Sequence, residues 1–244
     1  MQPELKPVPT NNDQGFGRSP YEAAPEAAYS TAEGQKVLRN TYLLLAVTMI
    51  PTVIGAFIGM QTASVIMASP IVASLVMLAV VIGLQFAIAA NRNSGLGVAL
   101  LLLMTGVLGW WLGPILNFVL KMSNGMQLVA YAALGTGGIF FAMATLSQTI
   151  KRDLGFMGKF LFVGMLALLA AGIANMFLQI PALALTISTL VIVLFSMFLL
   201  YDLQRIVRGG ETNYIMATTG VYMSLFNIFA NLLQLLGIFG GDRD

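Results

Sequence analysis

Asp202 is the side chain in this sequence best placed to do chemistry, because it is an ionisable carboxylate inside a long apolar stretch. The nearest acids on either side are Asp153 and Glu211. A carboxylate at mid-bilayer costs roughly 2.5–3.5 kcal/mol on insertion scales, so an acid there is a candidate for ion contact or gating. Arg205 lies about 4.5 Å further along a helix axis and nearly on the same face, so the alternative is a local ion pair at the membrane rim. The residues alone leave both interpretations open.

The sequence contains few of the side chains that common enzyme mechanisms require. The chain has no Cys and no His, which excludes thiol nucleophiles, thiolate metal sites and triads that use imidazole as the base. An aspartyl protease within a membrane needs two carboxylates that share a proton, and no second aspartate accompanies Asp202 in a predicted span. We therefore predict no catalytic residue, no metal site, no cofactor and a protein that is not an enzyme.

The composition is that of a helical protein embedded in a membrane. Hydrophobic residues make up 58% of the 244 residues and charged residues 9%, whereas soluble domains carry about 25% charged residues. The net charge of +2 is small and the basic residues are scattered, so the sequence does not predict nucleic-acid binding. The lipid bilayer is the first partner that the sequence predicts.

Apolar stretches long enough for a hydrocarbon core of about 30 Å divide the chain into seven predicted transmembrane helices. They cover residues 41–60, 70–90, 96–119, 127–149, 160–179, 182–203 and 213–238. Residues 1–35 are rich in Pro and polar residues and have no apolar periodicity, so we predict a disordered tail there. The expected organisation is that tail, a seven-span membrane domain over 36–239 and a short C-terminal tail over 240–244.

Basic residues near the span ends predict the orientation of the chain. One side of the membrane receives Lys36, Arg39, Arg92, Lys151, Arg152, Lys159, Arg205 and Arg208. The other side receives Lys121 and Arg243. We expect the side rich in basic residues to be the cytoplasm, so that the N-terminus is cytoplasmic and the C-terminus is external.

The last predicted span carries a stripe of polar and small residues along one face. The members recur at helical spacing within a sector of about 80°. They are Asn213, Gly220, Ser224, Asn227, Asn231 and Gln234. Amide and hydroxyl groups in lipid need partners, so the stripe predicts that this span is interior to the bundle and ringed by the others. The stripe serves either hydrogen bonds between helices or the lining of a polar pathway.

The segment before the last span reads as a structural turn. Gly209-Gly210 is a helix-stop signal, because glycine accepts the left-handed backbone that often ends a helix. Thr212 or Asn213 can then cap the last span, and Glu211 near that N-terminus complements the helix dipole.

Glycine pairs in two of the predicted spans indicate close helix packing. Gly55 and Gly59 lie one helical turn apart in the first span, and Gly109 and Gly113 lie one turn apart in the third. Small residues at this spacing let helix backbones approach closely in lipid. We therefore interpret these glycines as packing positions.

Motifs at the end of the sixth span and within the seventh resemble the Bax inhibitor-1 family of seven-span membrane proteins. They are YDLQRI over 201–206 and YMSLFNIF over 222–229. Stretches similar to the bacterial branch of the family are KVLRNTYLLL (36–45), LGPILN (112–117), FLQIPAL (177–183) and GGETNYI (209–215). The resemblance covers residues 36–239 and implies an all-α bundle in which six helices surround a central seventh.

The resemblance also implies a function. Family members that conduct or sense calcium carry one aspartate in the Tyr-Asp of span six and one in span seven; here Asp202 matches the first position and Ser224 stands at the second. Serine and Asp202 cannot form a pair of carboxylates that share a proton, and calcium prefers several oxygen ligands that include carboxylates. The bacterial branch implies a non-enzymatic inner-membrane protein that binds and modulates the ATP-dependent protease FtsH. We expect that function; the alternative is a pH- or calcium-sensitive cation leak, with Asp202, Arg205 and Ser224 meeting calcium or protons.

Overall fold

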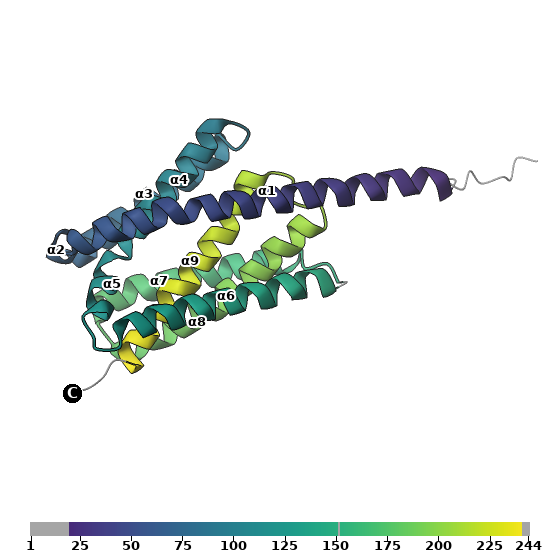
Figure 1. Cartoon of the computed structure of the whole chain (residues 1–244). Helices are drawn as coiled ribbons and strands as arrows, with labels where there is room; N and C mark the ends of the chain where they lie inside the picture. The colour runs from purple at the N-terminus through teal and green to yellow at the C-terminus, as the bar shows by residue number, and fades with distance from the viewer. Residues whose placement is uncertain (1–19, 151, 241–244) are drawn as a thin grey trace, which may run out of the picture.

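Helices make up almost all of the computed structural model, which describes residues 20–150 and 152–240, with side chains described from residue 34 onward. In chain order they are α1 (Pro20–Gln61), α2 (Ala63–Ala68), α3 (Pro70–Ala90), α4 (Gly95–Trp111), α5 (Gly113–Leu120), α6 (Gly125–Thr149), α7 (Met157–Leu178), α8 (Pro181–Val207) and α9 (Tyr214–Phe239). Figure 1 shows them gathered into one elongated bundle. The predicted all-α membrane fold is confirmed.

Six of these helices are long and apolar enough to cross a membrane on their own, and the pair α4 and α5 makes a seventh span with a bend of 40°. The sequence predicted one continuous helix over 96–119, so the bend is new. It falls at Leu112, directly before Gly113 and Pro114 at the start of α5. Proline has no backbone N–H and clashes with the preceding turn, which is why a helix bends or breaks there.

The helix α1 begins well before the first span. It is helical from Pro20, whereas the sequence predicted a disordered tail over 1–35. The physical reason is composition, because residues 20–33 contain several Ala and Glu, which are good helix formers, and the span provides a helix to continue. Residues 1–19 of that predicted tail, and 241–244 of the predicted C-terminal tail, lie outside the described residues.

The central helix of the bundle is α9. It contacts α1, α3, α4, α5, α6 and α8, while α7 packs mainly against α8. No residue of α9 between Ile215 and Gly237 is exposed, and Figure 1 shows this helix, drawn in yellow-green to yellow, running between the others. The stripe of polar residues therefore predicted the interior helix correctly.

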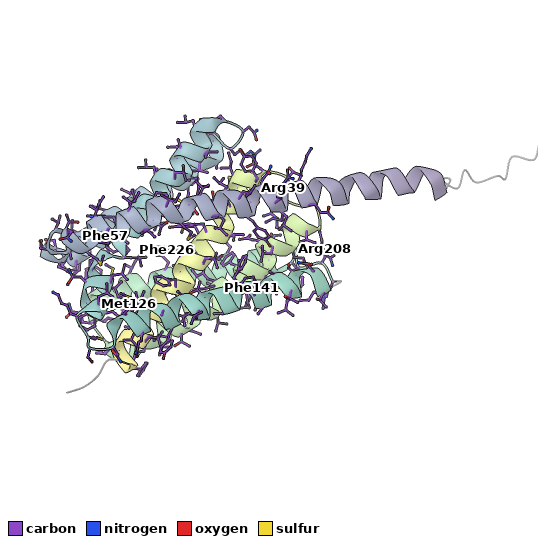
Figure 2. All side chains as sticks on the ribbon, in the orientation of Figure 1. Arg39, Phe57, Met126, Phe141, Arg208 and Phe226 are labelled. Carbon is purple, nitrogen blue, oxygen red and sulfur yellow. The ribbon has the colours of Figure 1, made fainter. Side chains whose placement is uncertain are left out.

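The outer faces of the other helices are apolar and suit contact with lipid. Phe57 on α1, Phe86 on α3 and Phe141 on α6 are 64%, 74% and 71% exposed. Figure 2 shows that Arg39 and Arg208 lie toward one end of the bundle, whereas Phe57 and Met126 lie toward the other. The end that holds these two arginines is called the basic end below.

The helices α1 and α4–α5 cross with their backbones in contact. A Cβ atom added to Gly59 would lie 2.1 Å from the carbonyl oxygen of Trp110, and one added to Gly113 would lie 2.0 Å from the carbonyl carbon of Gly59. Gly55 and Gly109 are as close to backbone atoms of the opposite helix. The predicted packing role of these glycines is confirmed, since any side chain there would separate the two helices.

A hydroxyl group fastens α9 to the same crossing. Tyr222, which is 2% exposed, exchanges a hydrogen bond of 2.8 Å with Thr52 Oγ1 on α1. The same hydroxyl donates to the carbonyl of Thr105 on α4 at 3.3 Å. Because lipid offers no competing partner, these bonds join three spans at one point.

Candidate functional site

A cavity of about 190 Å³ opens at the basic end of the bundle, where α8 turns back into α9. Its lining comes from α3, the end of α8, the connecting turn and the first two turns of α9. The residues are Gln85, Asp202, Arg205, Ile206, Glu211, Met216, Ala217, Thr219 and Gly220. The cavity thus brings together the candidate ion-contact residues Asp202 and Arg205, but its lining does not include Ser224.

Asp202 lies near the end of α8, about 7.5 Å along the axis from its last residue. Its carboxylate packs against α9 at Gly220, where an added Cβ would lie 2.7 Å from Oδ2. The glycine of the predicted stripe therefore makes room for the carboxylate. Among the described residues, nothing donates a hydrogen bond to Asp202, so its oxygens are free to meet whatever enters the cavity.

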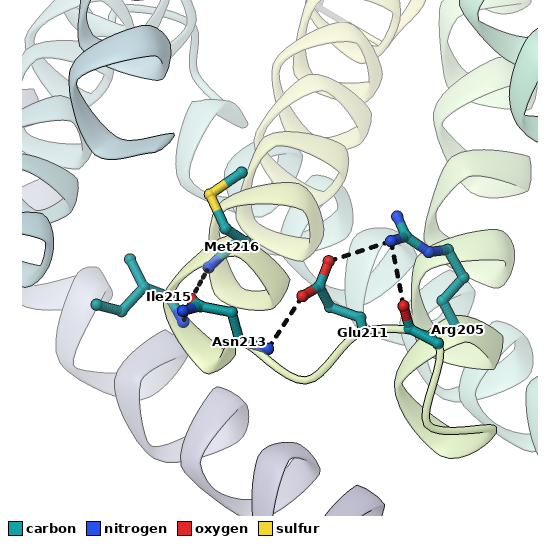
Figure 3. A network of polar contacts seen from close by, with 6 residues as sticks. Arg205, Glu211, Asn213, Ile215 and Met216 are labelled. Atoms are coloured by element: carbon teal, nitrogen blue, oxygen red, sulfur yellow. Dashed lines mark hydrogen bonds and ion pairs between the residues drawn. The ribbon is translucent and has the colours of Figure 1, made fainter. Parts of the chain in front are cut away.

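Arg205 forms an ion pair with Glu211 and not with Asp202, contrary to the local pair that one interpretation of the sequence expected. Arg205 Nη2 lies 3.2 Å from Glu211 Oε2 and donates to the carbonyl of Gly210 at 3.4 Å, as Figure 3 shows. Its guanidinium carbon lies 5.6 Å from the ring centroid of Tyr201. The Arg205 side chain is 41% exposed, so the pair contributes at most about 1 kcal/mol to stability.

The turn between α8 and α9 is closed by side-chain caps. Gly209 has a φ of 74°, and the backbone N–H of Gly210 donates to the carbonyl of Arg205 at 2.8 Å, so α8 ends at the glycine pair as predicted. Asn213 caps α9, because its Oδ1 accepts from the backbone N–H groups of Ile215 and Met216, each at 3.0 Å. Figure 3 shows these bonds beside the ion pair.

Asn213 also ties this turn to the loop between α3 and α4. Its Nδ2 donates to the carbonyl of Arg92 and to Oδ1 of Asn93, both at 2.8 Å. Glu211 Oε1 accepts from the backbone N–H of Asn213 at 3.0 Å. Although Asn213 belongs to the predicted stripe, it therefore acts as a cap and a loop contact at the basic end.

The amide side chains of the stripe make most of their hydrogen bonds within α9 itself. Asn227 Nδ2 donates to the carbonyl of Met223, and Asn231 Nδ2 donates to that of Asn227, both at 2.8 Å. Gln234 makes one bond to another span, accepting from Ser188 Oγ on α8 at 3.3 Å. Ser224 is 1% exposed. Because the cavity ends at Gly220, these amides do not form a continuous lining with it.

Sequence reasoning missed Gln204, a buried residue that holds the loop between α6 and α7. Gln204 is 2% exposed. Its Oε1 accepts from the backbone N–H of Leu154 at 2.9 Å, and its Nε2 donates to the carbonyls of Ile150 at 3.2 Å and Arg152 at 3.0 Å. The signal that the sequence offers is a neutral amide inside a predicted span end, two residues after Asp202.

The YDLQRI motif consequently makes contacts on two faces of α8. Tyr201, Gln204 and, just after the motif, Arg208 recur at helical spacing on one face. The Tyr201 hydroxyl lies 2.7 Å from where a Cβ of Gly158, at the start of α7, would be, and Arg208 Nη2 donates to the carbonyl of Ile150 at 2.9 Å. Asp202 lines the cavity instead. One helical segment therefore positions both a loop and a cavity.

The chemistry within reach of the cavity is ionic. Over the described part of the chain, no cluster of three or more Asp, Glu, His or Cys side chains is arranged to hold a metal ion. Asp202 and Glu211 supply two carboxylates and Arg205 one cation, and Glu211 is already paired. Such a site can exchange a proton or weakly contact a cation.

Comparison with known proteins relates the whole arrangement to one family. A family model described as "Inhibitor of apoptosis-promoting Bax1" matches residues 34–241. An Escherichia coli K12 protein named modulator of FtsH protease YccA is 40% identical over 207 residues, which cover 85% of this chain and 92% of that protein. An uncharacterized membrane protein of Vibrio cholerae is 40% identical over 212 residues, covering 87% and 93%. A protein of Escherichia coli O6:H1 with the same 40% identity is named inner membrane protein YccA.

Proposed function

Because the chain belongs to the Bax inhibitor-1 family, we propose that it is a multi-pass inner-membrane protein that binds and modulates the ATP-dependent protease FtsH. The observation that carries this proposal is the 40% identity, over 92% of its length, to the Escherichia coli protein named as a modulator of that protease. Likeness over all spans supports a shared mode of action more strongly than likeness in one motif does.

The proposed orientation puts the basic end of the bundle in the cytoplasm and the C-terminus in the periplasm. Arg39 and Arg208 mark that end (Figure 2), and cytoplasmic loops are the ones enriched in Lys and Arg. The helix α1 extends past the bundle at the same end (Figure 1), by about 20 Å over residues 20–33. An ATP-dependent protease that works from the cytoplasm can reach this extension, so we propose it as the first contact.

We propose binding, without catalysis, as the mode of action. The sequence offers neither His nor Cys as nucleophile or base. Asp202 shares its cavity with Glu211, which Arg205 already neutralises. The large apolar faces of the outer helices are the surfaces available to another membrane protein, and the modulator would act through them and through its cytoplasmic end.

Co-purification from native membranes is the direct test of this function. The tagged full-length chain, extracted in mild detergent, is expected to carry FtsH with it, and a variant that lacks residues 2–33 is expected to carry several-fold less. The spans begin at Gly34, so this truncation leaves the bundle whole. The control is an equally abundant seven-span protein with the same tag. Recovery of the protease at the level of this control would contradict the proposal.

A second candidate function, a pH- or calcium-sensitive cation leak, is favoured by one observation: the Asp202 carboxylate lines the cavity and accepts no hydrogen bond from the described residues. In this candidate, Asn227, Asn231 and Gln234 would line the pathway beyond the cavity. The single carboxylate, with Ser224 where calcium-sensing relatives are expected to carry a second, disfavours it.

Calcium flux into proteoliposomes tests the second candidate. If the protein is a leak, flux exceeds that of empty liposomes, and Asp202→Asn abolishes its response to pH, because the amide keeps the shape of the carboxylate without its charge. Asp153→Asn makes the same change at an exposed loop position and is expected to keep the response. Equal flux with and without protein, or an unchanged response in Asp202→Asn, would remove the leak as a function.

A further inference from the structure

The loop between α6 and α7 is held in one shape at the basic end of the bundle. Gln204 bonds the backbone at Ile150, Arg152 and Leu154, and Arg208 donates to the same Ile150 carbonyl. Leu154 is 7% exposed and anchors the loop in the bundle. A loop fixed at three alternate residues presents its outward side chains in a defined arrangement.

Those outward side chains combine aromatic rings with positive charge. Phe156 and Phe160 are 62% and 70% exposed, and they lie one helical turn apart at the start of α7. The Arg152 guanidinium carbon lies 5.2 Å from the centroid of the Phe156 ring, and Lys159, which directly precedes Phe160, is also exposed. We name the set Arg152, Phe156, Lys159, Phe160 and Arg208 the α6–α7 surface.

The charge of the α6–α7 surface is strongly one-sided. It contains three basic residues, and the acid within the described part of its loop is Asp153, whose Oδ1 accepts from the backbone N–H of Gly155 at 2.9 Å. The carboxylate is therefore engaged by the loop itself. Lys151 is a further basic residue in the sequence, and its structure lies outside the described residues.

We propose that the α6–α7 surface binds the headgroups of anionic phospholipids. It lies where two spans, α6 and α7, end, so its rings reach the depth of the lipid headgroups, where aromatic side chains are enriched. Basic side chains beside an anionic leaflet each contribute about 1 kcal/mol, or about fivefold in affinity. A lipid explains both features at once: its phosphate meets Arg152, Lys159 and Arg208, and its acyl chains meet Phe156 and Phe160.

The test measures lipid binding to the purified full-length chain in mild detergent. Phosphatidylglycerol and phosphatidylcholine are added separately, and the lipids retained are counted by mass spectrometry of the intact complex. Phosphatidylglycerol is expected to bind preferentially, and more weakly as salt rises, because ions screen exposed charges. The double variant Arg152→Gln/Lys159→Gln is expected to lower the affinity for phosphatidylglycerol about 25-fold, which is fivefold for each charge.

Matched controls separate this surface from charge in general. Lys36→Gln/Arg39→Gln removes the same charge from α1 near the same end and is expected to keep the wild-type affinity. If the double variant has less helix than the wild type and so is misfolded, Lys159→Gln alone provides the test. It is expected to lower the affinity for phosphatidylglycerol about fivefold. Soluble glycerol 1-phosphate separates the lipid from a free phosphate and is expected not to bind. The proposal would be overturned if the protein retained the two lipids equally, or if the variants of the α6–α7 surface and of α1 lost the same affinity. Binding of glycerol 1-phosphate as tight as that of the lipid would overturn it too.

Discussion

Gly59→Ala and Gly113→Ala are each expected to destabilise the bundle by about 3 kcal/mol or more, the upper end for a methyl group forced into a packed interior. The added methyl of Gly59→Ala would lie 2.1 Å from a carbonyl oxygen, and that of Gly113→Ala would lie 2.0 Å from a carbonyl carbon. Both obstacles are backbone atoms of the opposite helix, so no side chain can rotate away. Relief requires α1 to move off α4–α5, which also pulls Thr52 from Tyr222.

The thermal midpoint of the detergent-purified protein and its abundance in the membrane measure this effect. Gly83→Ala is the matched control, because nothing lies within 4 Å of its added Cβ. Alanine at that helical position is expected to be neutral or to stabilise by about 0.5–1 kcal/mol. If Gly59→Ala unfolds at the temperature of Gly83→Ala, the backbone contact between α1 and α4–α5 is not what holds the crossing together.

Gln204→Leu is expected to cost about 3 kcal/mol and to release the α6–α7 loop. Leucine is close in size to glutamine but leaves the N–H of Leu154 and the carbonyl of Arg152 without their partner, and each unmet buried group costs about 1–3 kcal/mol. The carbonyl of Ile150 keeps its bond from Arg208. Once the loop opens, water can bond the freed backbone groups, and this limits the total loss of stability. Trypsin cleaves after Lys and Arg where the backbone can adapt to its active site, so faster cleavage after Arg152 is the measurement of the released loop.

Two further variants show that hydrogen bonds, and not volume, carry the effect of Gln204. Gln204→Glu keeps an acceptor for Leu154 but turns an oxygen toward two carbonyl oxygens, so it is expected to open the loop as well. Gln148→Leu makes the leucine change at an exposed position of α6 and is expected to leave cleavage unchanged. Wild-type resistance to trypsin in Gln204→Leu would contradict the assigned role.

Much of the fold could be predicted from the sequence because lipid imposes simple constraints. A span needs about 20 apolar residues, so the limits of α3, α6 and α9 were predicted within about two residues. Polar groups must face protein, so the stripe on α9 predicted the central helix. The resemblance carried by YDLQRI and its companion motifs is confirmed by the family match over 34–241.

The details of the site depend on contacts between distant residues, which spacing along the chain does not reveal. Arg205 has acids three residues before it and six residues after it, and the turn at Gly209 brings Glu211 back within 3.2 Å. Gln204 meets a loop about 50 residues away in the chain. Pro114 was a signal for the 40° bend at Leu112, but the apolar content of 96–119 predicted one continuous helix.

The two faces of YDLQRI make the end of α8 intolerant of changes in chain length. Consecutive residues of a helix are rotated by 100°, so deleting one residue between Pro181 and Tyr201 would turn the whole motif by that angle. Gln204 would then leave the loop and Asp202 would leave Gly220 in the same event, although no motif residue had been changed. Engineered insertions and fusion points therefore belong outside α8, and this helix is expected to keep a constant length among proteins that share both contacts.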